Sequence, residues 1–322
     1  MMTSTDYGSR RQMPYWVCAF FVFAAAIAGC ATLGGEQGQT LVPTKYQTRT
    51  GPYVVFTNFS MATDAPAIRH LQSLDRQIQE TLNLRIDPGD HPIEVYVLSD
   101  KKAFTHFLTF YYPELPPRRA FFLAQGPRRV VYTYLGERLE EDLRHEATHA
   151  LLHVAVSEMP LWLDEGLAEY FEGPDERGGV NPEHLARLPQ DRSQGWKPDL
   201  PRLEALKDVR QMSPRDYRES WAWVHYLLHG PAADKQALLA YMDELRNDPA
   251  AAPLSARLQE NDTEAAPHML AHLDKIRERP IASSAPPKDG TVRLQSLNTT
   301  EAQPPGTPRR GFFGRLAGLF GF

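Results

Sequence analysis

The chain contains 322 residues, of which 42% are hydrophobic and 23% are charged, and this balance excludes a wholly disordered chain or a coiled-coil rod. Its formal net charge of −5 argues against binding to nucleic acid, because phosphate contacts require a basic surface. The 2 cysteines, Cys18 and Cys30, both lie near the N-terminus, so a fold stapled by disulfide bonds is also excluded.

Residues 1–29 have the features of a secretory signal peptide. Arg10 and Arg11 precede an apolar run of about 13 residues, whereas a membrane-spanning helix needs roughly 20. The tetrapeptide from Ile27 to Cys30 resembles the lipobox of bacterial lipoproteins, which implies cleavage before Cys30 and lipidation of its thiol. A buried N-terminal helix is the alternative for this stretch.

The lipoprotein resemblance also bears on location. Ala31 follows the lipidated cysteine, which implies sorting to the outer membrane, facing the periplasm, with the lipid on Cys30 as the membrane anchor. Residues 30–50 are rich in Gly, Thr and Gln and lack periodicity, so we predict that they form a tether between the lipid and the fold.

Residues 51–136 are predicted to form a small mixed α/β sheet lobe. Helices are expected at 65–84 and 101–110, because apolar residues recur there at helical spacing. Stretches of β-branched and aromatic residues predict four strands, at 53–56, 93–98, 120–124 and 130–135. The last of these strands is expected to present an edge to an extended peptide.

Residues 137–279 are predicted to form a helical lobe. Residues 174–202 within it are rich in Gly, Pro and Asp, so they are expected to form a long surface loop. The expected helices span 137–156, 160–172, 203–209, 214–229, 233–246 and 264–278.

Residues 280–322 change in composition and are expected to form a disordered tail. Its end, 309–322, is basic, apolar and rich in Gly. Two alternatives are open for this end. It binds the membrane interface or a partner protein, or it is an unstructured segment.

The main chemical signal is the sequence His145-Glu146-Ala147-Thr148-His149 within the predicted helix 137–156. Residues four apart share one face of a helix, so both imidazoles can converge on one ion. Glu146 follows the first histidine and can act as general base toward a water at that ion. A catalytic zinc also needs a third protein ligand and one open position.

A second motif, WLxEGLAxYxE, occupies residues 162–172. Together with HExxH it resembles the gluzincin metallopeptidases, above all the peptidase-MA-like secreted and lipoprotein domains, over about residues 51–278. The resemblance implies an α+β fold class, in which the small mixed α/β sheet lobe is followed by a helical zincin (thermolysin-like) lobe. It also implies that Glu165 is the third ligand of one Zn²⁺ per chain, which completes the His₂Glu set of thermolysin.

The same resemblance assigns supporting residues. Glu169 is expected to accept a hydrogen bond from a ligating histidine. Asp164 either has such an orienting role or caps the helix. Because Gly166 and Ala168 are small, helix 160–172 is expected to approach the histidine-bearing helix closely.

The helix that begins near Tyr217 resembles the one that carries the catalytic tyrosine of the aminopeptidase N family. This resemblance implies that Tyr217 donates a hydrogen bond to the oxyanion of a tetrahedral intermediate. His225 and His229, on the same predicted helix, are alternative donors. The Gly-x-Met-Glu-Asn strand by which those aminopeptidases capture a free amine has no counterpart here, which favours cleavage within a chain over exopeptidase activity.

The sequence therefore predicts a zinc-dependent peptidase, anchored by lipid in the bacterial envelope, that cleaves a peptide or protein substrate by metal-activated water. The alternative is a zinc-containing lipoprotein without turnover that binds peptides or assists envelope assembly. A third reading is a structural envelope protein for which the tail 309–322 matters most.

Overall fold

The structure, a computed structural model, describes residues 41–262 and 264–278. The predictions for the signal peptide 1–29, for Cys30 and for the tail 280–322 with its end 309–322 lie outside these residues. Within the described part of the chain, every helix is too short or too polar to cross a bilayer.

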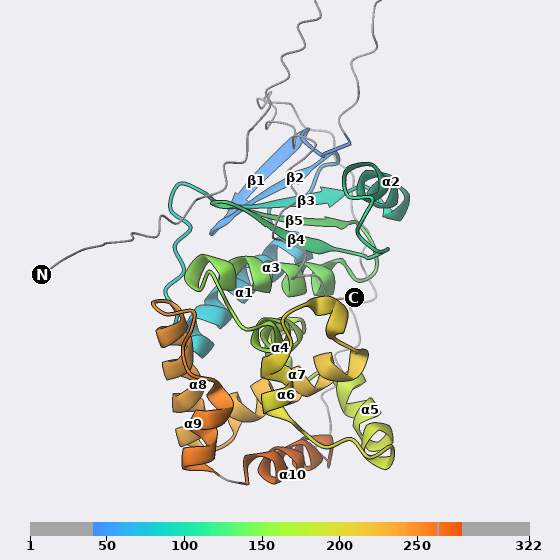
Figure 1. Cartoon of the computed structure of the whole chain (residues 1–322). Coiled ribbons are helices and arrows are strands. Elements are labelled where there is room, and N and C mark those ends of the chain that lie inside the picture. The colour runs from blue at the N-terminus through green and yellow to red at the C-terminus, as the bar shows by residue number, and fades with distance from the viewer. Residues whose placement is uncertain (1–40, 263, 279–322) are drawn as a thin grey trace, which may run out of the picture. The chain divides into compact units, whose positions relative to one another are not determined.

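A five-stranded mixed sheet forms one side of the fold (Figure 1). Its strand order is β1-β2-β3-β5-β4. The three central strands β2, β3 and β5 run parallel, while β1 and β4 pair antiparallel at the two edges. The strands span Tyr46–Thr50 (β1), Tyr53–Thr57 (β2), Ile93–Leu98 (β3), Phe121–Gln125 (β4) and Arg128–Tyr134 (β5).

Alternation along the strands gives the sheet two apolar faces. Val95 and Val131 point to the face covered by α1 (Pro66–Leu82) and α3 (Leu139–Ala155). Tyr96 and Tyr132 point to the opposite face, where they join an aromatic cluster beneath α2 (Lys101–Tyr111). The sheet is therefore buried on both sides, as parallel strands require.

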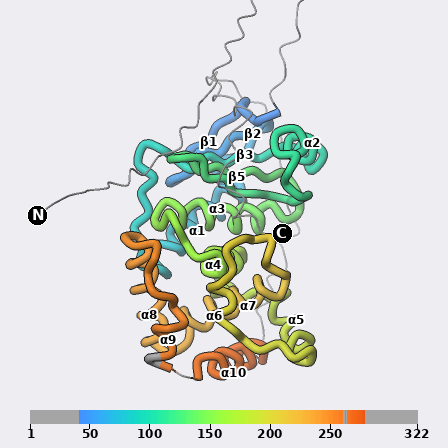
Figure 2. Tube along the Cα trace, in the orientation of Figure 1, coloured from blue at the N-terminus to red at the C-terminus, as the bar shows by residue number. Residues whose placement is uncertain are grey.

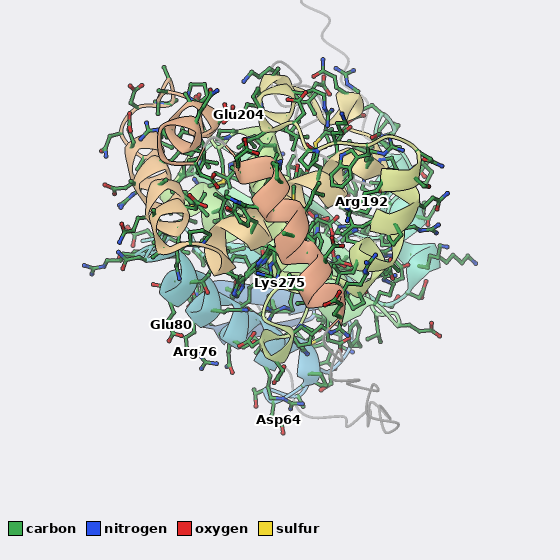
Figure 3. All side chains as sticks on the ribbon, turned by 90° about the horizontal axis from the view of Figure 1, so that it is seen from below. Asp64, Arg76, Glu80, Arg192, Glu204 and Lys275 are labelled. Atoms are coloured by element: carbon green, nitrogen blue, oxygen red, sulfur yellow. The ribbon has the colours of Figure 1, made fainter. Side chains whose placement is uncertain are left out.

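The remaining helices follow the sheet in sequence and lie beyond α3 in space (Figure 2). Helix α4 packs against both α3 and α7, and α7 in turn contacts α8 and α10. Figure 3, seen from below, shows α10 crossing in front of the other helices. Asp274 of α10 pairs with Arg192 of α5 at 2.9 Å. These helices are α4 (Leu161–Phe171), α5 (Pro182–Ser193), α6 (Leu200–Ala205), α7 (Pro214–His229), α8 (Ala232–Leu245), α9 (Leu254–Asn261) and α10 (Ala265–Glu278).

The predicted mixed α/β sheet followed by helices is confirmed at this level. Most expected elements occur within a few residues of their predicted bounds, among them α3 and α4. The sheet lobe and the helical lobe, which the sequence divides at 136/137, share one hydrophobic core. A continuous cluster of buried apolar side chains extends from Tyr53 in β2 to Ile276 in α10.

Two segments differ from the prediction. Residues 46–50 of the predicted tether form β1, whose mostly polar side chains give no apolar pattern. The predicted loop 174–202 contains a 3-10 turn, Asp175–Arg177, and helix α5. The sequence of α5 looked irregular because Pro189 lies inside it, but Asn181 caps its N-terminus by accepting hydrogen bonds from the amides of Glu183 and His184.

Three smaller differences concern two helices and the sheet edge. Helix α6 ends at Ala205 rather than continuing to 209, and α9 was not predicted, because only Leu254 and Leu258 mark its buried face. The expected edge strand 130–135 is wrong: β5 lies between β3 and β4, so the edge beside α3 is β4.

Candidate metal centre

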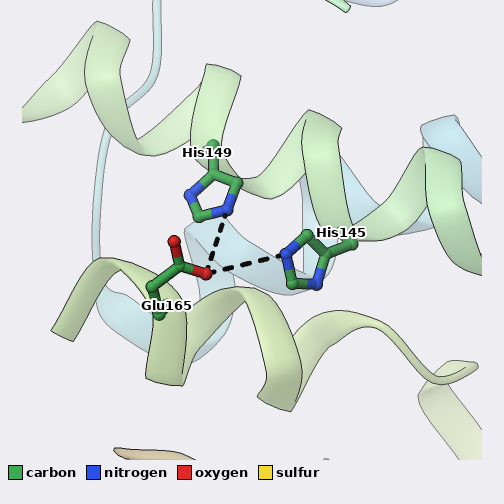
Figure 4. A group of neighbouring side chains, drawn as sticks. All are labelled: His145, His149 and Glu165. Carbon is green, nitrogen blue, oxygen red and sulfur yellow. Dashed lines mark ion pairs between the residues drawn. The ribbon is translucent and has the colours of Figure 1, made fainter. Parts of the chain in front are cut away.

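Helices α3 and α4 bring two histidines and one glutamate together (Figure 4). Glu165 Oε2 lies 3.8 Å from Nε2 of His145 and 3.7 Å from Nε2 of His149. The three ligand atoms all lie within 4.8 Å of one another, so this group could hold a metal ion. The arrangement follows from the i, i+4 spacing on α3 and from the packing of α4 against the same helix face.

Arg144 fixes α3 next to the first histidine of the group. Its side chain is 1% exposed. The guanidinium donates hydrogen bonds to the backbone oxygen of Phe171 at 2.8 Å, to Gln77 Oε1 at 2.6 Å and to Ser73 Oγ at 3.2 Å. These bonds join α3 to α1 and to the end of α4, so the two helices that supply the candidate ligands are held in register.

The carboxylate of Glu165 is buried without a hydrogen-bond partner among the described residues. The residue is 0% exposed, and neither side-chain oxygen has a hydrogen-bond partner among the described residues. Burial raises the pKa of Glu165 to about 7, against the opposing charges of His149 and His145. A buried ionised carboxylate is costly unless a cation lies against it, so its surroundings favour a positive charge at this point.

Two further carboxylates orient the imidazoles. Asp164 Oδ1 lies 3.0 Å from His149 Nδ1, and its Oδ2 lies 3.2 Å from His153 Nε2. Glu172 Oε2 lies 3.3 Å from His145 Nδ1. In both candidate ligands the Nδ1 side thus faces a carboxylate, which leaves Nε2 directed toward Glu165.

Of the two residues expected to orient the ligands, Asp164 lies beside Nδ1 of His149, and Glu169 lies near His145 but contacts a histidine of α5. Glu169 Oε2 pairs with His184 Nε2 at 3.0 Å and accepts a hydrogen bond from Asn181 at 3.2 Å. The carboxylate at His145 is that of Glu172, seven residues after Glu165 and on the same helix face. Glu172 is the last letter of the WLxEGLAxYxE motif, whereas His184 lies in α5, where no helix was expected.

The small residue Gly166 packs against α7, and not against the histidine-bearing helix α3 as expected. A Cβ at this position would lie 2.7 Å from the backbone oxygen of Ser220 and 2.9 Å from Val224 Cγ2, both in α7. Gly166 therefore permits close packing of α4 on α7, while Glu165, the preceding residue, faces α3.

Tyr217 lies at the start of α7 and is buried. Its ring packs with Leu161, the first residue of α4, and with Val209 and Met212. Glu146 is partly exposed on α3, and its charge acts on His145, Glu165 and Arg118. Burial lowers the pKa of Arg118, and the negative charges of Glu146, Tyr217 and Glu165 oppose that shift.

The two alternative donors have partners elsewhere. His225 Nδ1 lies 3.0 Å from His272 Nε2 of α10, and His229 Nε2 lies 2.8 Å from the hydroxyl of Tyr170. The rings of His225 and His229 stack at 4.5 Å. They form a separate histidine cluster between α4, α7 and α10.

Comparison with known protein families gives one match. The model for DUF1570, a protein of unknown function, matches residues 141–251. The matched segment begins in α3 and ends after α8, so it includes the three candidate ligands, Glu146 and Tyr217. A search of curated proteins finds no match.

Proposed function

We propose that the protein is a zinc-dependent peptidase of the gluzincin type, in which His145, His149 and Glu165 hold the ion. The observation that carries the proposal is the buried Glu165 carboxylate, which has no hydrogen-bond partner among the described residues and faces two imidazole nitrogens. A cation between these three groups would satisfy all of them at once. The sheet followed by helices supports a thermolysin-like arrangement.

The donor set suits zinc in chemistry and spacing. Zinc takes imidazole nitrogen and carboxylate oxygen at roughly 2.0–2.2 Å, and a tetrahedral ion then separates its ligands by about 3.3–3.5 Å. The present separations of 3.7 and 3.8 Å are too long for hydrogen bonds and close to that ligand spacing. Three protein ligands would leave one position open, as a catalytic site requires.

The chain's own groups supply the proton chemistry. When bound, zinc would act as a Lewis acid that polarises a carbonyl group and acidifies water. Glu146 would take a proton from the attacking water and deliver it to the nitrogen of the departing amine. Tyr217 would donate a hydrogen bond to the carbonyl oxygen as negative charge develops there.

The position of β4 supports an extended peptide as the substrate. β4 is the edge strand beside α3, and Phe122 within it stacks on His149 with 6.3 Å between the ring centroids. A peptide that added to this edge would run along the histidine-bearing helix. This supports cleavage within a chain.

The envelope location, through lipidated Cys30, is part of the same proposal, and membrane fractionation of a Cys30→Ala variant tests it.

The test combines metal content with cleavage. The full chain is purified, its zinc is measured by elemental analysis, and hydrolysis of a denatured protein such as casein is followed. We expect one zinc per chain and cleavage that a chelator abolishes. Glu146→Gln should retain zinc and fold but lose nearly all hydrolysis. Turnover in this variant equal to that of the unmodified protein would refute the assignment.

The alternative function has its own signature in this experiment. Zinc at one per chain without cleavage of casein or of a broad peptide library would favour a peptide-binding lipoprotein. A chain that binds no zinc at micromolar concentrations would exclude both.

A further inference from the structure

His153 lies one turn beyond His149 on α3 and is buried, with 5% of the residue exposed. Residues four apart share one face of a helix, so both rings can meet the same group of α4. That group is the carboxylate of Asp164. Its Oδ2 lies 3.2 Å from Nε2 of His153, at hydrogen-bond distance, and its Oδ1 lies 3.0 Å from Nδ1 of His149. One carboxylate of α4 thus bridges two histidines of α3, of which only His149 is a candidate ligand.

The orientation of the Asp164 carboxylate depends on His153. Asp164 is 0% exposed, and among the described residues the hydrogen bond with His153 is the only one to its carboxylate. The contact of Oδ1 with Nδ1 of His149 is short but does not have the angles of a hydrogen bond. Because the terminal torsion of an aspartate is soft, the bond at Oδ2 is what keeps Oδ1 against His149.

His153 is itself held from the side of the sheet. The ring of Phe122 in β4 packs against it, with 5.3 Å between the ring centroids. Arg129 of β5 donates from Nε and Nη2 to the backbone oxygen of His153, at 3.1 and 2.7 Å. These bonds satisfy one of the carbonyl groups that the end of a helix leaves without a partner. His153 is therefore fixed between the sheet and α4, as a residue that orients another must be.

We propose that His153 is a positioning residue of the metal centre, which donates a hydrogen bond from Nε2 to Asp164 and so holds that carboxylate against Nδ1 of His149. The inference rests on the metal site of the proposed function and extends it to a residue outside both motifs. In this arrangement His153 carries its proton on Nε2. His149 carries its proton on Nδ1, which directs its Nε2 toward the ion.

Two substitutions at one position separate the hydrogen bond from packing. His153→Leu keeps an apolar side chain but removes the donor, whereas His153→Gln retains an N–H donor. We expect His153→Leu to weaken zinc binding about 3–10-fold, which is less than for a residue in direct contact with a ligand. His153→Gln should restore most of the loss. Competition with a fluorescent zinc chelator measures the affinity.

His70→Leu is the control for these variants, because it removes a half-buried histidine of α1. It should leave the zinc affinity unchanged. Equal affinities in His153→Leu and this control would overturn the proposal, and so would a loss that His153→Gln does not restore.

A double-mutant cycle tests the route through Asp164. If His153 acts by holding that carboxylate, His153→Leu should cause no further loss of zinc affinity in the Asp164→Asn variant. Two losses that multiply would overturn the proposal, because they would show that the two residues act independently.

A spectroscopic measurement requires no substitution. In the isotope-labelled full chain loaded with zinc, imidazole NMR spectra show which nitrogen of each histidine carries a proton. We expect Nε2–H for His153 and Nδ1–H for His149. A proton on Nδ1 alone in His153 would overturn the proposal, because Nε2 could not then donate to Asp164.

None of these measurements uses turnover, so the inference and the peptidase can fail separately. Zinc binding with the expected pattern but no cleavage of casein would refute the peptidase and keep the role of His153. Cleavage of casein with unchanged zinc affinity in His153→Leu would keep the peptidase and overturn the inference. A chain that binds no zinc would overturn both.

Discussion

Asp164 lies 3.0 Å from Nδ1 of His149, on the side of the imidazole ring opposite to Glu165. Consecutive residues of α4 thus address both nitrogens of one histidine. Asp164 also contacts His153, one turn along α3. The charge of His149 is the main influence that lowers the pKa of Asp164 against the effect of burial, so Asp164 remains ionised beside the ring.

We predict that Asp164→Asn weakens zinc binding 10–100-fold, since carboxylates that orient ligating histidines commonly have effects of about this size. Competition with a fluorescent zinc chelator measures the affinity. Glu183→Gln is the matched control, because Glu183 is a largely exposed carboxylate that pairs with Arg138 and not with a candidate ligand. Equal affinities in the two variants would show that Asp164 does not orient the ligand.

Glu165→Gln should separate the two effects of a buried carboxylate. Without metal the variant is expected to be as stable as the unmodified protein or more stable, because it no longer buries a charge. With zinc at about 1,000 times its dissociation constant, the unmodified protein should gain about 4 kcal/mol and the variant far less. Chemical denaturation with and without zinc measures both. Equal stabilisation by zinc would remove Glu165 from the ligand set.

Gly166→Ala should push α4 away from α7, because its Cβ would meet backbone atoms of Ser220 at 2.7 and 2.8 Å. Overpacking of this kind typically costs about 1–3 kcal/mol of folding stability. Gly173→Ala is the control, since its Cβ would meet only the flexible side chain of Arg177, at 3.3 Å. Urea denaturation of both variants tests the prediction. A loss in Gly166→Ala no larger than in the control would contradict the packing argument.

The histidine cluster predicts a loss of stability in acid. Burial, with the neighbouring His229 and His272, lowers the pKa of His225 from 6.5 to about 3. The folded state therefore keeps this ring neutral, and its contribution is complete above pH 6.5 and declines as the pH falls from 6.5 toward 3. The expected slope is up to about 1.4 kcal/mol per pH unit for this group.

His225→Phe should flatten that part of the stability curve, measured as the free energy of unfolding between pH 4 and 7. The exposed residue His106, changed to Gln, serves as the control and should leave the curve unchanged. An identical curve in both variants would show that His225 does not cause the acid sensitivity.

The sequence predicted well those features that depend on local spacing. The helical period places His145 and His149 on one face, and strong apolar patterns fixed the position of β3 and α7. Features that depend on tertiary contacts were harder to predict. Nothing local distinguishes Glu169 from Glu172 as the partner of His145, because both lie on the helix face of Glu165. Only the fold shows that Glu172 pairs with His145 and Glu169 with His184 of α5.

Phe122 illustrates the same limit. It belongs to no motif, and its ring lies against His149 only because strand order brings β4 beside α3. The expected edge strand was wrong for a related reason, since both β4 and β5 read as apolar strands and only the pairing of β5 with β3 decides which lies inside.

The contact between Gly166 and Ser220 lies on the side of α4 that faces away from the candidate ligands. Substitutions on α7 that add or remove volume at this helix–helix contact would tilt α4, which carries Glu165. They would do so without changing any candidate ligand atom. On the proposed function, the choice of divalent ion would therefore depend on residues of α7 that do not contact the ion.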